Sequence, residues 1–202
     1  MKIVPIVLEG KYVRLEPLTL DHAPDLFEAG NDDEVWQFLS IPRPDSLVEM
    51  QAFIQGALGQ QLAGLRIPFA IIDKVSGKAA GTTSYLDIQP QNRGLEIGWT
   101  WLGKAYWRSA INTECKYLLL SHAFDAQGAI RVQLKTDSRN WRSQNAIERI
   151  GAKKEGVLRK HVIYPSGYIR DSVYFSIIDT EWPLVKERLK ARMGDPEFAG
   201  RD

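Results

Sequence analysis

The sequence predicts a single α+β (α/β) domain built around a mixed β-sheet. Residues 95–151 read as strand, irregular loop, helix, strand, polar loop and helix, an order that predicts two parallel strands joined by a right-handed crossover. Two other regions, 67–88 and 154–178, each contain two strand-like segments separated by a turn with glycine, which is typical of antiparallel hairpins. A chain of 202 residues is long enough to bury a substantial core in one domain.

The first part of the chain is predicted to form a strand and two helices. Alternating apolar residues indicate a strand over 11–17. A helix over 21–30 then carries Pro24 in its first turn, a position that proline favours, and ends at a glycine. The second helix is predicted over 46–62. The segment between the two helices reads as a loop or a broken helix.

The rest of the chain is predicted to alternate strands with helices. The expected elements are strands at 67–73, 79–88 and 95–102, a helix from about 109–112 to 124, a strand at 131–136, a short helix at 145–150, strands at 154–164 and 168–178, and a helix at 181–193. Trp182 and Pro183 suit the first turn of the last helix. The single domain therefore covers 1–202, with its core at about 10–193 and a frayed tail at 194–202.

The strand at 95–102 and the connection after it carry the most information. Its apolar residues alternate and are predicted to share one face: Leu95, Ile97, Trp99 and Trp101. Glu96 then points to the other face. The connection runs into a helix that starts between Ser109 and Asn112, and a helix N-terminus offers unpaired N–H groups and positive potential that suit a phosphate.

Composition excludes several classes of protein. Lysine and arginine total 26 against 25 aspartate and glutamate residues, a net charge of +1, so no nucleic-acid partner or acidic membrane surface is expected. No apolar run approaches the length of a membrane span, and the N-terminus lacks a cleavage region, so we expect a cytoplasmic protein. The single cysteine, Cys115, lies in an apolar helical pattern and reads as a core residue, with a catalytic thiol as the alternative.

Short motifs follow one another in a specific order through the second half of the chain. They are Glu96-Ile97-Gly98-Trp99, Tyr106-Trp107 with Asn112-Thr113-Glu114, Asn140-x-x-Ser143-x-Asn145-Ala146, Ile150-Gly151-Ala152 and Glu155-Gly156-Val157-Leu158-Arg159. Their order and spacing resemble the GNAT superfamily of N-acetyltransferases, especially the branch that contains the ribosomal-protein N-terminal acetyltransferases. The resemblance extends from Gly10 to about Met193.

The resemblance implies both a fold and an activity. The expected fold is a strongly twisted mixed sheet flanked by helices, whose two central parallel strands splay apart and admit the pantetheine arm of an acyl-CoA. The implied activity is transfer of an acetyl group from acetyl-CoA to a primary amine, on a protein N-terminus or a small molecule, by direct attack in a ternary complex. No metal is expected, because no cluster of histidine, cysteine and carboxylate residues has metal-site spacing. A homodimer is compatible with the family and with exposed strand edges.

The pyrophosphate loop of the family departs from its usual pattern in this chain. The usual pattern is Gln/Arg-x-x-Gly-x-Gly/Ala, and the matching residues are 107–112, so that Ala110 and Asn112 stand at the glycine positions. If glycine is needed there for close approach or for a positive φ, cofactor binding is weakened. Asparagine tolerates left-handed geometry, however, and Arg108 adds a positive charge near the phosphates. The resemblance implies these cofactor-binding residues: Trp101, Leu102, Trp107, Arg108, Ser109, Ala110, Ile111, Asn112, Thr113, Asn140 and Ser143.

Two interpretations of this loop are therefore open. In the first, the loop is modified but still binds CoA. In the second, Asn112 only caps the helix and Arg108 is solvated, and the protein is a CoA-binding or regulatory module without transfer activity.

The candidate catalytic residues are Glu96 and Ser143. Transfer to an amine needs a group that accepts the proton of the amine and a proton source near the departing thiolate. By resemblance, Glu96 is the candidate general base, directly or through water, and the alternative is a salt-bridged or surface glutamate. Also by resemblance, Asn140 binds the pantetheine arm and Ser143 lies near the sulfur. Asn140 can also cap a helix, with Ser143 in its first turn.

The remaining polar residues carry weaker signals. His122 lies in an apolar helical pattern and His161 in a strand, so both are expected to be packed or surface histidines. The acidic residues of the least recognisable region either attract a cationic acceptor or are solvated loop charges: Asp32, Asp33, Glu34 and Asp45. A peptide acceptor favours an open groove there, and a small amine favours a closed pocket.

Overall fold

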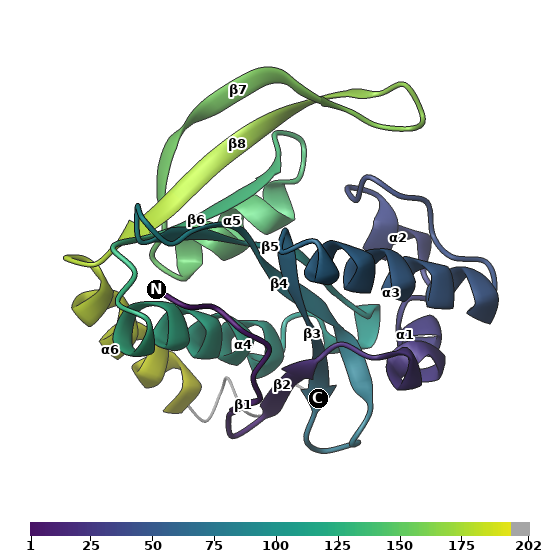
Figure 1. The fold of residues 1–202 in the computed structure, drawn as a ribbon, viewed down its shortest axis with the longest axis horizontal. Coiled ribbons are helices and arrows are strands. Elements are labelled where there is room, and N and C mark those ends of the chain that lie inside the picture. The colour runs from purple at the N-terminus through teal and green to yellow at the C-terminus, as the bar shows by residue number, and fades with distance from the viewer. Residues whose placement is uncertain (195–202) are drawn as a thin grey trace.

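The computed structural model describes residues 1–194, which form an eight-stranded sheet with helices on both faces (Figure 1). The strand order is β1-β2-β3-β4-β5-β6-β8-β7. The strands are β1 Leu8–Glu9, β2 Val13–Pro17, β3 Arg66–Asp73, β4 Ala79–Gln89, β5 Gly94–Leu102, β6 Arg131–Asp137, β7 Lys153–Ile163 and β8 Ile169–Ile178. All neighbours are antiparallel except β5 and β6, which are parallel. The predicted mixed sheet is therefore confirmed.

The helices form two groups, each over its own hydrophobic core. The first group is α1 Ala23–Ala29, α2 Asp33–Trp36 and α3 Leu47–Leu62, and the second is α4 Ala110–Ser121, α5 Trp141–Arg149 and α6 Trp182–Gly194. The first group shares the smaller core, with Ile54 and Trp101, whereas the second shares the larger core, with Ile97 and Leu119. Figure 1 shows α1–α3 on one side of the molecule and α4 and α6 on the other. No helix in residues 1–194 is both long and apolar enough to cross a membrane.

Several helix boundaries differ from the predicted ones. Helix α5 begins at Trp141 rather than near residue 145, because the Asn140 side chain caps its N-terminus. Helix α4 starts where predicted and continues into a π-helical turn, His122–Ala126. The last helix begins at Trp182, with Pro183 in its first turn as expected, and it includes Gly194. The rest of the predicted tail, from residue 195, lies outside the described residues.

The two parallel strands separate soon after they meet. Strand β5 pairs with β6 over only three positions, Gly94–Glu96 against Arg131–Gln133. Beyond these positions β5 continues to Leu102 and β6 to Asp137 without pairing with each other. The predicted splay of the two central strands is therefore confirmed, and the edges that face the gap carry backbone N–H and C=O groups that can bind a ligand.

A bulge reverses the alternation along β5. The register between β4 and β5 shifts near Trp99, which takes a φ of +48°. The structure contradicts the prediction that four apolar residues of this strand share one face: Leu95, Ile97, Trp99 and Trp101. The first two lie in the larger core, whereas Trp101 lies in the smaller core on the opposite face. Glu96 precedes the bulge and points away from the larger core, toward the α1–α3 side of the sheet. Because the extra residue reverses the alternation that follows it, Trp101 points toward the same side.

A buried carboxylate joins α4 to the turn before β2. Glu114 is 4% exposed, and its carboxylate accepts hydrogen bonds from the backbone N–H groups of Lys11, Tyr12 and Val13 at 2.7, 2.6 and 2.7 Å. Gly10 passes directly over this carboxylate, since a Cβ at position 10 would lie 2.5 Å from Glu114 Cδ. Charge-assisted hydrogen bonds of this kind are stronger than neutral ones. The contact therefore ties the N-terminal segment to α4.

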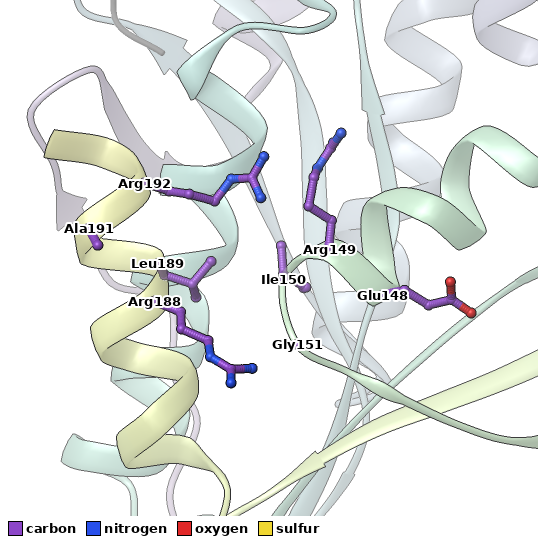
Figure 2. Close-up of a pocket in the computed structure, with 8 residues that line it drawn as sticks. All are labelled: Glu148, Arg149, Ile150, Gly151, Arg188, Leu189, Ala191 and Arg192. Atoms are coloured by element: carbon purple, nitrogen blue, oxygen red, sulfur yellow. The ribbon is translucent and has the colours of Figure 1, made fainter. Parts of the chain in front are cut away.

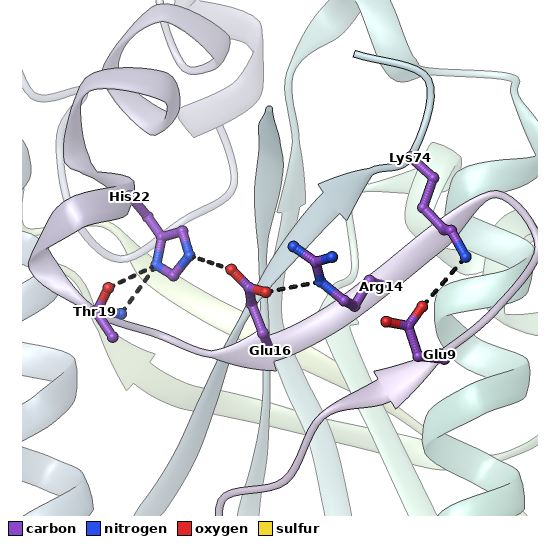
Figure 3. A network of polar contacts seen from close by, with 6 residues as sticks. All are labelled: Glu9, Arg14, Glu16, Thr19, His22 and Lys74. Atoms are coloured by element: carbon purple, nitrogen blue, oxygen red, sulfur yellow. Dashed lines mark hydrogen bonds and ion pairs between the residues drawn. The ribbon is translucent and has the colours of Figure 1, made fainter. Parts of the chain in front are cut away.

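A chain of polar contacts fixes the passage from β2 into α1 (Figure 3). The Glu16 carboxylate lies 2.8 Å from both Arg14 Nε and His22 Nε2, and the backbone N–H of Thr19 donates to His22 Nδ1 at 3.0 Å. Burial raises the pKa of Glu16, but the hydrogen bonds from His22 and Arg14 outweigh burial and lower that pKa. None of these residues belongs to the sequence motifs, and we assign the cluster a structural role.

The β7–β8 hairpin reaches beyond the rest of the sheet and meets the segment between α2 and α3. Figure 1 shows the hairpin extending over the molecule toward α2. At its end the Tyr164 hydroxyl donates a hydrogen bond to the Phe38 carbonyl at 3.0 Å. The guanidinium of Arg139, from the loop after β6, lies 3.5 Å from the Tyr168 ring centroid and 5.8 Å from that of Phe38. These cation–π contacts join three loops that are far apart in the sequence.

Candidate active site

The gap between β5 and β6 opens toward the N-termini of two helices. Each of these parallel strands leads through a short connection into a helix, β5 into α4 and β6 into α5. Parallel strands present their C-terminal ends at the same edge of a sheet, where ligands of open α/β sheets commonly bind. The residues predicted around 107–113 and 140–143 therefore lie at the two sides of the same gap.

The connection before α4 forms a candidate cradle for an anion. Ser109 caps α4, with its Oγ accepting from Ile111 N at 3.4 Å and donating to the Tyr106 carbonyl at 2.7 Å. Arg108 takes a φ of +64°, is exposed and makes no ion pair with any residue in the described part of the chain. The N-terminus of a helix attracts anions through its free N–H groups and its dipole. Arg108 adds a flexible positive charge beside it.

The two residues that replace the family glycines have ordinary helical roles. Ala110 and Asn112 lie within α4, so neither takes a positive φ, and the left-handed residue of this loop is Arg108. The Ala110 side chain is 6% exposed and packs into the protein. The alternative in which Asn112 caps the helix is wrong, because Ser109 is the cap. The backbone of this loop therefore does not need a glycine with positive φ at position 110 or at position 112.

Stacking between Arg142 and Trp107 joins the two sides of the gap. The Arg142 guanidinium carbon lies 3.6 Å from the Trp107 ring centroid, and Trp107 Nε1 donates to the Leu102 carbonyl at 2.8 Å. Burial lowers the pKa of Arg142, and the charge of Glu34 opposes that shift. Sequence reasoning missed Arg142, although it lies within the Asn140-x-x-Ser143 motif. Its stacking partner could not be read from the spacing.

Asn140 and Ser143 lie at the N-terminus of α5, and each keeps a polar group available. Asn140 Oδ1 accepts from the backbone N–H of Ser143 at 3.0 Å, so the predicted capping role of Asn140 is confirmed. No other residue in the described chain bonds to the Asn140 Nδ2 group or to the Ser143 hydroxyl. An amide donor and a hydroxyl at the mouth of the gap suit a pantetheine carbonyl and a thiolate.

Glu96 is buried and paired. Its side chain is 2% exposed, and Oε2 lies 2.9 Å from Gln133 Nε2 and 3.0 Å from Lys135 Nζ. Oε1 has no hydrogen-bond partner in the described chain. The expected alternative of a salt-bridged glutamate is therefore confirmed, and the carboxylate still has one oxygen that can accept a proton or a water.

Several of the predicted cofactor residues are buried. Trp101 packs against Trp36, with 4.9 Å between ring centroids, and Ile111 lies in the larger core. The other buried side chains among the predicted residues are Leu102, Ala110 and Thr113. Any contact of these residues with a bound cofactor would have to use mainly their backbone groups.

Cys115 and His122 are packed and His161 is an exposed strand residue, in line with the expectation of packed or surface histidines. Burial raises the pKa of the Cys115 thiol to about 11, which disfavours a nucleophilic thiolate. Burial lowers the pKa of His122, whose Nδ1 lies 3.2 Å from the Tyr85 hydroxyl. His161 Nδ1 lies 3.0 Å from Ser172 Oγ, and its pKa is lowered by burial and by the charges of Lys135 and Arg170. Both rings favour the neutral form.

A separate cavity lies between α5 and α6 (Figure 2). Its volume is about 460 Å³, and Arg149, Arg188 and Arg192 line it. None of the predicted site residues lines this cavity, and Figure 2 shows the Glu148 carboxylate pointing away from the three arginines. It is therefore distinct from the gap between β5 and β6.

Comparisons with known proteins agree with this geometry. The chain is 26% identical over 174 residues to the uncharacterized N-acetyltransferase YoaA of Bacillus subtilis, which covers 85% of this chain and 96% of that protein. A GCN5-related N-acetyltransferase from Brucella melitensis superposes with a TM-score of 0.91 at 33% identity, over 98% of this chain and 89% of that one. Mycobacterium smegmatis RimJ, solved in complex with CoA-disulfide, shares the fold with a TM-score of 0.79 at 20% identity, over 93% of this chain and 94% of that one.

The family model described as an acetyltransferase (GNAT) domain matches residues 13–153, which include β2 through α5 and both sides of the gap. The chain belongs to the GNAT family of acetyltransferases.

Proposed function

We propose that this protein transfers an acetyl group from acetyl-CoA to a primary amine, on a protein N-terminus or a small molecule, by direct attack in a ternary complex. The observation that carries the proposal is the gap between β5 and β6, which ends at the N-terminus of α4. A narrow gap with free backbone groups suits an extended pantetheine arm, and a helix N-terminus suits the pyrophosphate to which that arm is attached.

The described residues offer suitable partners along this path. The N–H groups at the start of α4 and the Arg108 guanidinium would hold the phosphates, and the Asn140 amide would donate to the pantetheine arm. Acetyl-CoA supplies the acetyl group as an activated thioester. Trp107 and Arg142, stacked at 3.6 Å, would keep the two loops at a fixed distance.

Two residues are proposed to move protons. Glu96 Oε1, from β5, would accept the proton of the amine, directly or through a water, while Lys135 and Gln133 hold Oε2 in place. The Ser143 hydroxyl, at the first turn of α5, would donate a proton to the departing sulfur and regain one from water, to which Glu96 releases the proton of the amine. Support for both assignments comes from the motif positions and from two polar atoms without a partner in the described chain, Glu96 Oε1 and the Ser143 hydroxyl.

The second candidate function is a CoA-binding or regulatory module without transfer activity. Its motivation is the absence of the usual glycines at positions 110 and 112. The helical backbone and inward packing of Ala110 weaken this motivation, because neither a left-handed φ nor a side chain in the cradle is required there. Transfer activity is therefore the favoured proposal.

Calorimetric titration with acetyl-CoA, and with desulfo-CoA as a nonreactive comparison, tests the cofactor site. We expect saturable binding of both, with the affinity reduced about tenfold in an Arg108→Ala variant because one charge-assisted phosphate contact is lost. Arg159→Ala, which removes an arginine from β7, is the matched control and should bind as tightly as the wild type. A folded protein that binds neither nucleotide would exclude the acetyl-CoA proposal.

Replacing Ser143 with alanine is expected to lower kcat by about 10- to 100-fold while the dissociation constant for desulfo-CoA is unchanged. The fold should be preserved, because the hydroxyl bonds to no residue in the described chain. Single-turnover acetyl transfer measures the effect, and Ser166→Ala in the β7–β8 turn is the control. An unchanged kcat in a folded Ser143→Ala protein would assign the proton to water instead.

The acceptor and the assembly are also open to test. The hydrogen bond from the Tyr164 hydroxyl to the Phe38 carbonyl joins the end of the β7–β8 hairpin to the segment between α2 and α3, and this favours an enclosed acceptor. A screen of small amines against peptides with free N-termini would distinguish the two classes. A homodimer would give about twice the chain mass in light scattering of the purified protein.

A further inference from the structure

Arg66, at the start of β3, is buried without a counter-charge. The residue is 2% exposed, its Nε donates to Ser84 Oγ at 2.8 Å, and its guanidinium carbon lies 4.9 Å from the Trp99 ring centroid. Nη2 is buried and has no hydrogen-bond partner in the described chain, and no carboxylate there pairs with the guanidinium. Burial lowers the pKa of Arg66 to about 10, so the group is charged at neutral pH. A buried charge normally needs a partner of opposite sign.

The same face of the sheet does contain a carboxylate, but that carboxylate is already neutralised. Glu96 forms its ion pair with Lys135, with 3.0 Å between Oε2 and Nζ. Glu96 is therefore not free to neutralise Arg66, and the Arg66 guanidinium has no carboxylate partner in the described chain.

Strand register places Arg66 and Glu96 in one row across the sheet. Arg66 lies opposite Leu86 on β4, and Leu86 lies opposite Glu96 on β5. Residues directly opposite each other point to the same face, and neighbouring strands lie about 4.8 Å apart, so the two backbone positions are about 10 Å apart. Leu86, between them, is only half-buried. Their side chains can therefore approach the two ends of a small molecule that lies across Leu86.

We propose that Arg66 is a specificity-determining residue that binds a carboxylate of the amine acceptor. The acceptor would be an amino acid in which the amine reaches Glu96 while the carboxylate takes the free edge of the Arg66 guanidinium. Ser84 holds the Nε edge and the Trp99 ring holds one face, which leaves the Nη groups for a carboxylate. The inference rests on the proposed acetyl transfer but names its substrate class.

The test compares ω-amino acids of increasing length with their amides: glycine, β-alanine and γ-aminobutyrate against glycinamide, β-alaninamide and γ-aminobutyramide. Calorimetry with the desulfo-CoA complex is expected to show that at least one acid binds tenfold or more tightly than its amide. Arg66→Met should abolish this ratio, and Arg66→Lys should retain part of it, since lysine keeps the charge without the fork. Arg14→Met, on the neighbouring strand β2, removes a half-buried arginine that pairs with Glu16, and it should leave the ratio unchanged.

The possible results separate this inference from the proposed function. Turnover is measured with the amides as well, so acetylation of any amide supports transfer activity whatever the acids do. Equal binding of acids and amides at every length, or no binding of any acid, would overturn the carboxylate site. If a folded Arg66→Met protein with normal desulfo-CoA affinity still binds the acid more tightly than its amide by the wild-type ratio, that result would also overturn the carboxylate site. Loss of the acid-to-amide ratio in Arg66→Met, together with a reduced ratio in Arg66→Lys and unchanged melting temperatures in both variants, would support it.

Discussion

Replacing Glu114 with alanine is expected to lower the free energy of unfolding by about 3 kcal/mol. The substitution removes a buried carboxylate and leaves the N–H groups of Lys11, Tyr12 and Val13 without their acceptor. Each hydrogen bond to a charged group contributes roughly 1.5–3 kcal/mol, and water that enters beside the partly buried groups recovers some of the loss. Urea unfolding followed by circular dichroism measures the change.

Gly10→Ala offers an independent test of the same contact. A Cβ at this position would lie 2.5 Å from Glu114 Cδ, so the carboxylate or the turn has to shift. The two single variants share one interaction, and we therefore expect the double variant to be less destabilised than the sum of the two. Glu187→Ala, which removes an exposed glutamate of α6, is the control and should stay within about 0.5 kcal/mol of the wild type. If Glu114→Ala also stays within that range, the contact does not stabilise the fold.

Replacing Glu96 with glutamine is expected to lower kcat by about 10²- to 10⁴-fold, the usual range for loss of a general base. The amide oxygen of glutamine can still accept hydrogen bonds from Gln133 and Lys135, so the fold should be retained. A base acts only in its deprotonated form, so part of the rise of the wild-type kcat/KM with pH should depend on Glu96. The variant should lack this part of the rise. Acetyl transfer assayed across a pH series measures both effects.

Glu155→Gln is the matched control for this substitution. Glu155 lies on β7 and pairs with Arg131, and the hydrogen bond from that arginine lowers the pKa of Glu155 to about 2. The pair is exposed, so its loss should change stability only slightly and should leave the pH profile of transfer unchanged. If Glu96→Gln keeps the full rate at every pH, Glu96 is a structural partner of Lys135 and water is the base.

Much of the candidate site could be predicted from local sequence patterns. The change from alternating to helical periodicity between residues 95 and 124 placed β5 and α4, and the start of α4 falls within the predicted 109–112. The Asn140-x-x-Ser143 spacing placed the start of α5. Asn140 caps the helix, and its side-chain oxygen accepts a hydrogen bond from the backbone N–H of Ser143. These features depend on neighbours within one helical turn, and such short-range preferences are readable from one chain.

The contacts between distant segments could not be predicted. The bulge at Trp99 moved Trp101 to the opposite core, because one extra residue reverses every position that follows it. Nothing in the spacing of Arg142 indicated that it would stack on Trp107, since that contact depends on how two loops meet.

The sequence by itself therefore determined the family, the order of the elements and the residues at the start of α4 and α5. Periodicity and capping act over a few residues, and the motifs lie within single elements. Only the tertiary structure decided which charges meet: Glu96 with Lys135, and Arg66 with no carboxylate in the described chain. These pairings follow from strand order and register, which bring residues 66, 86 and 96 into one row. Side chains so far apart in the sequence become neighbours only when the sheet forms.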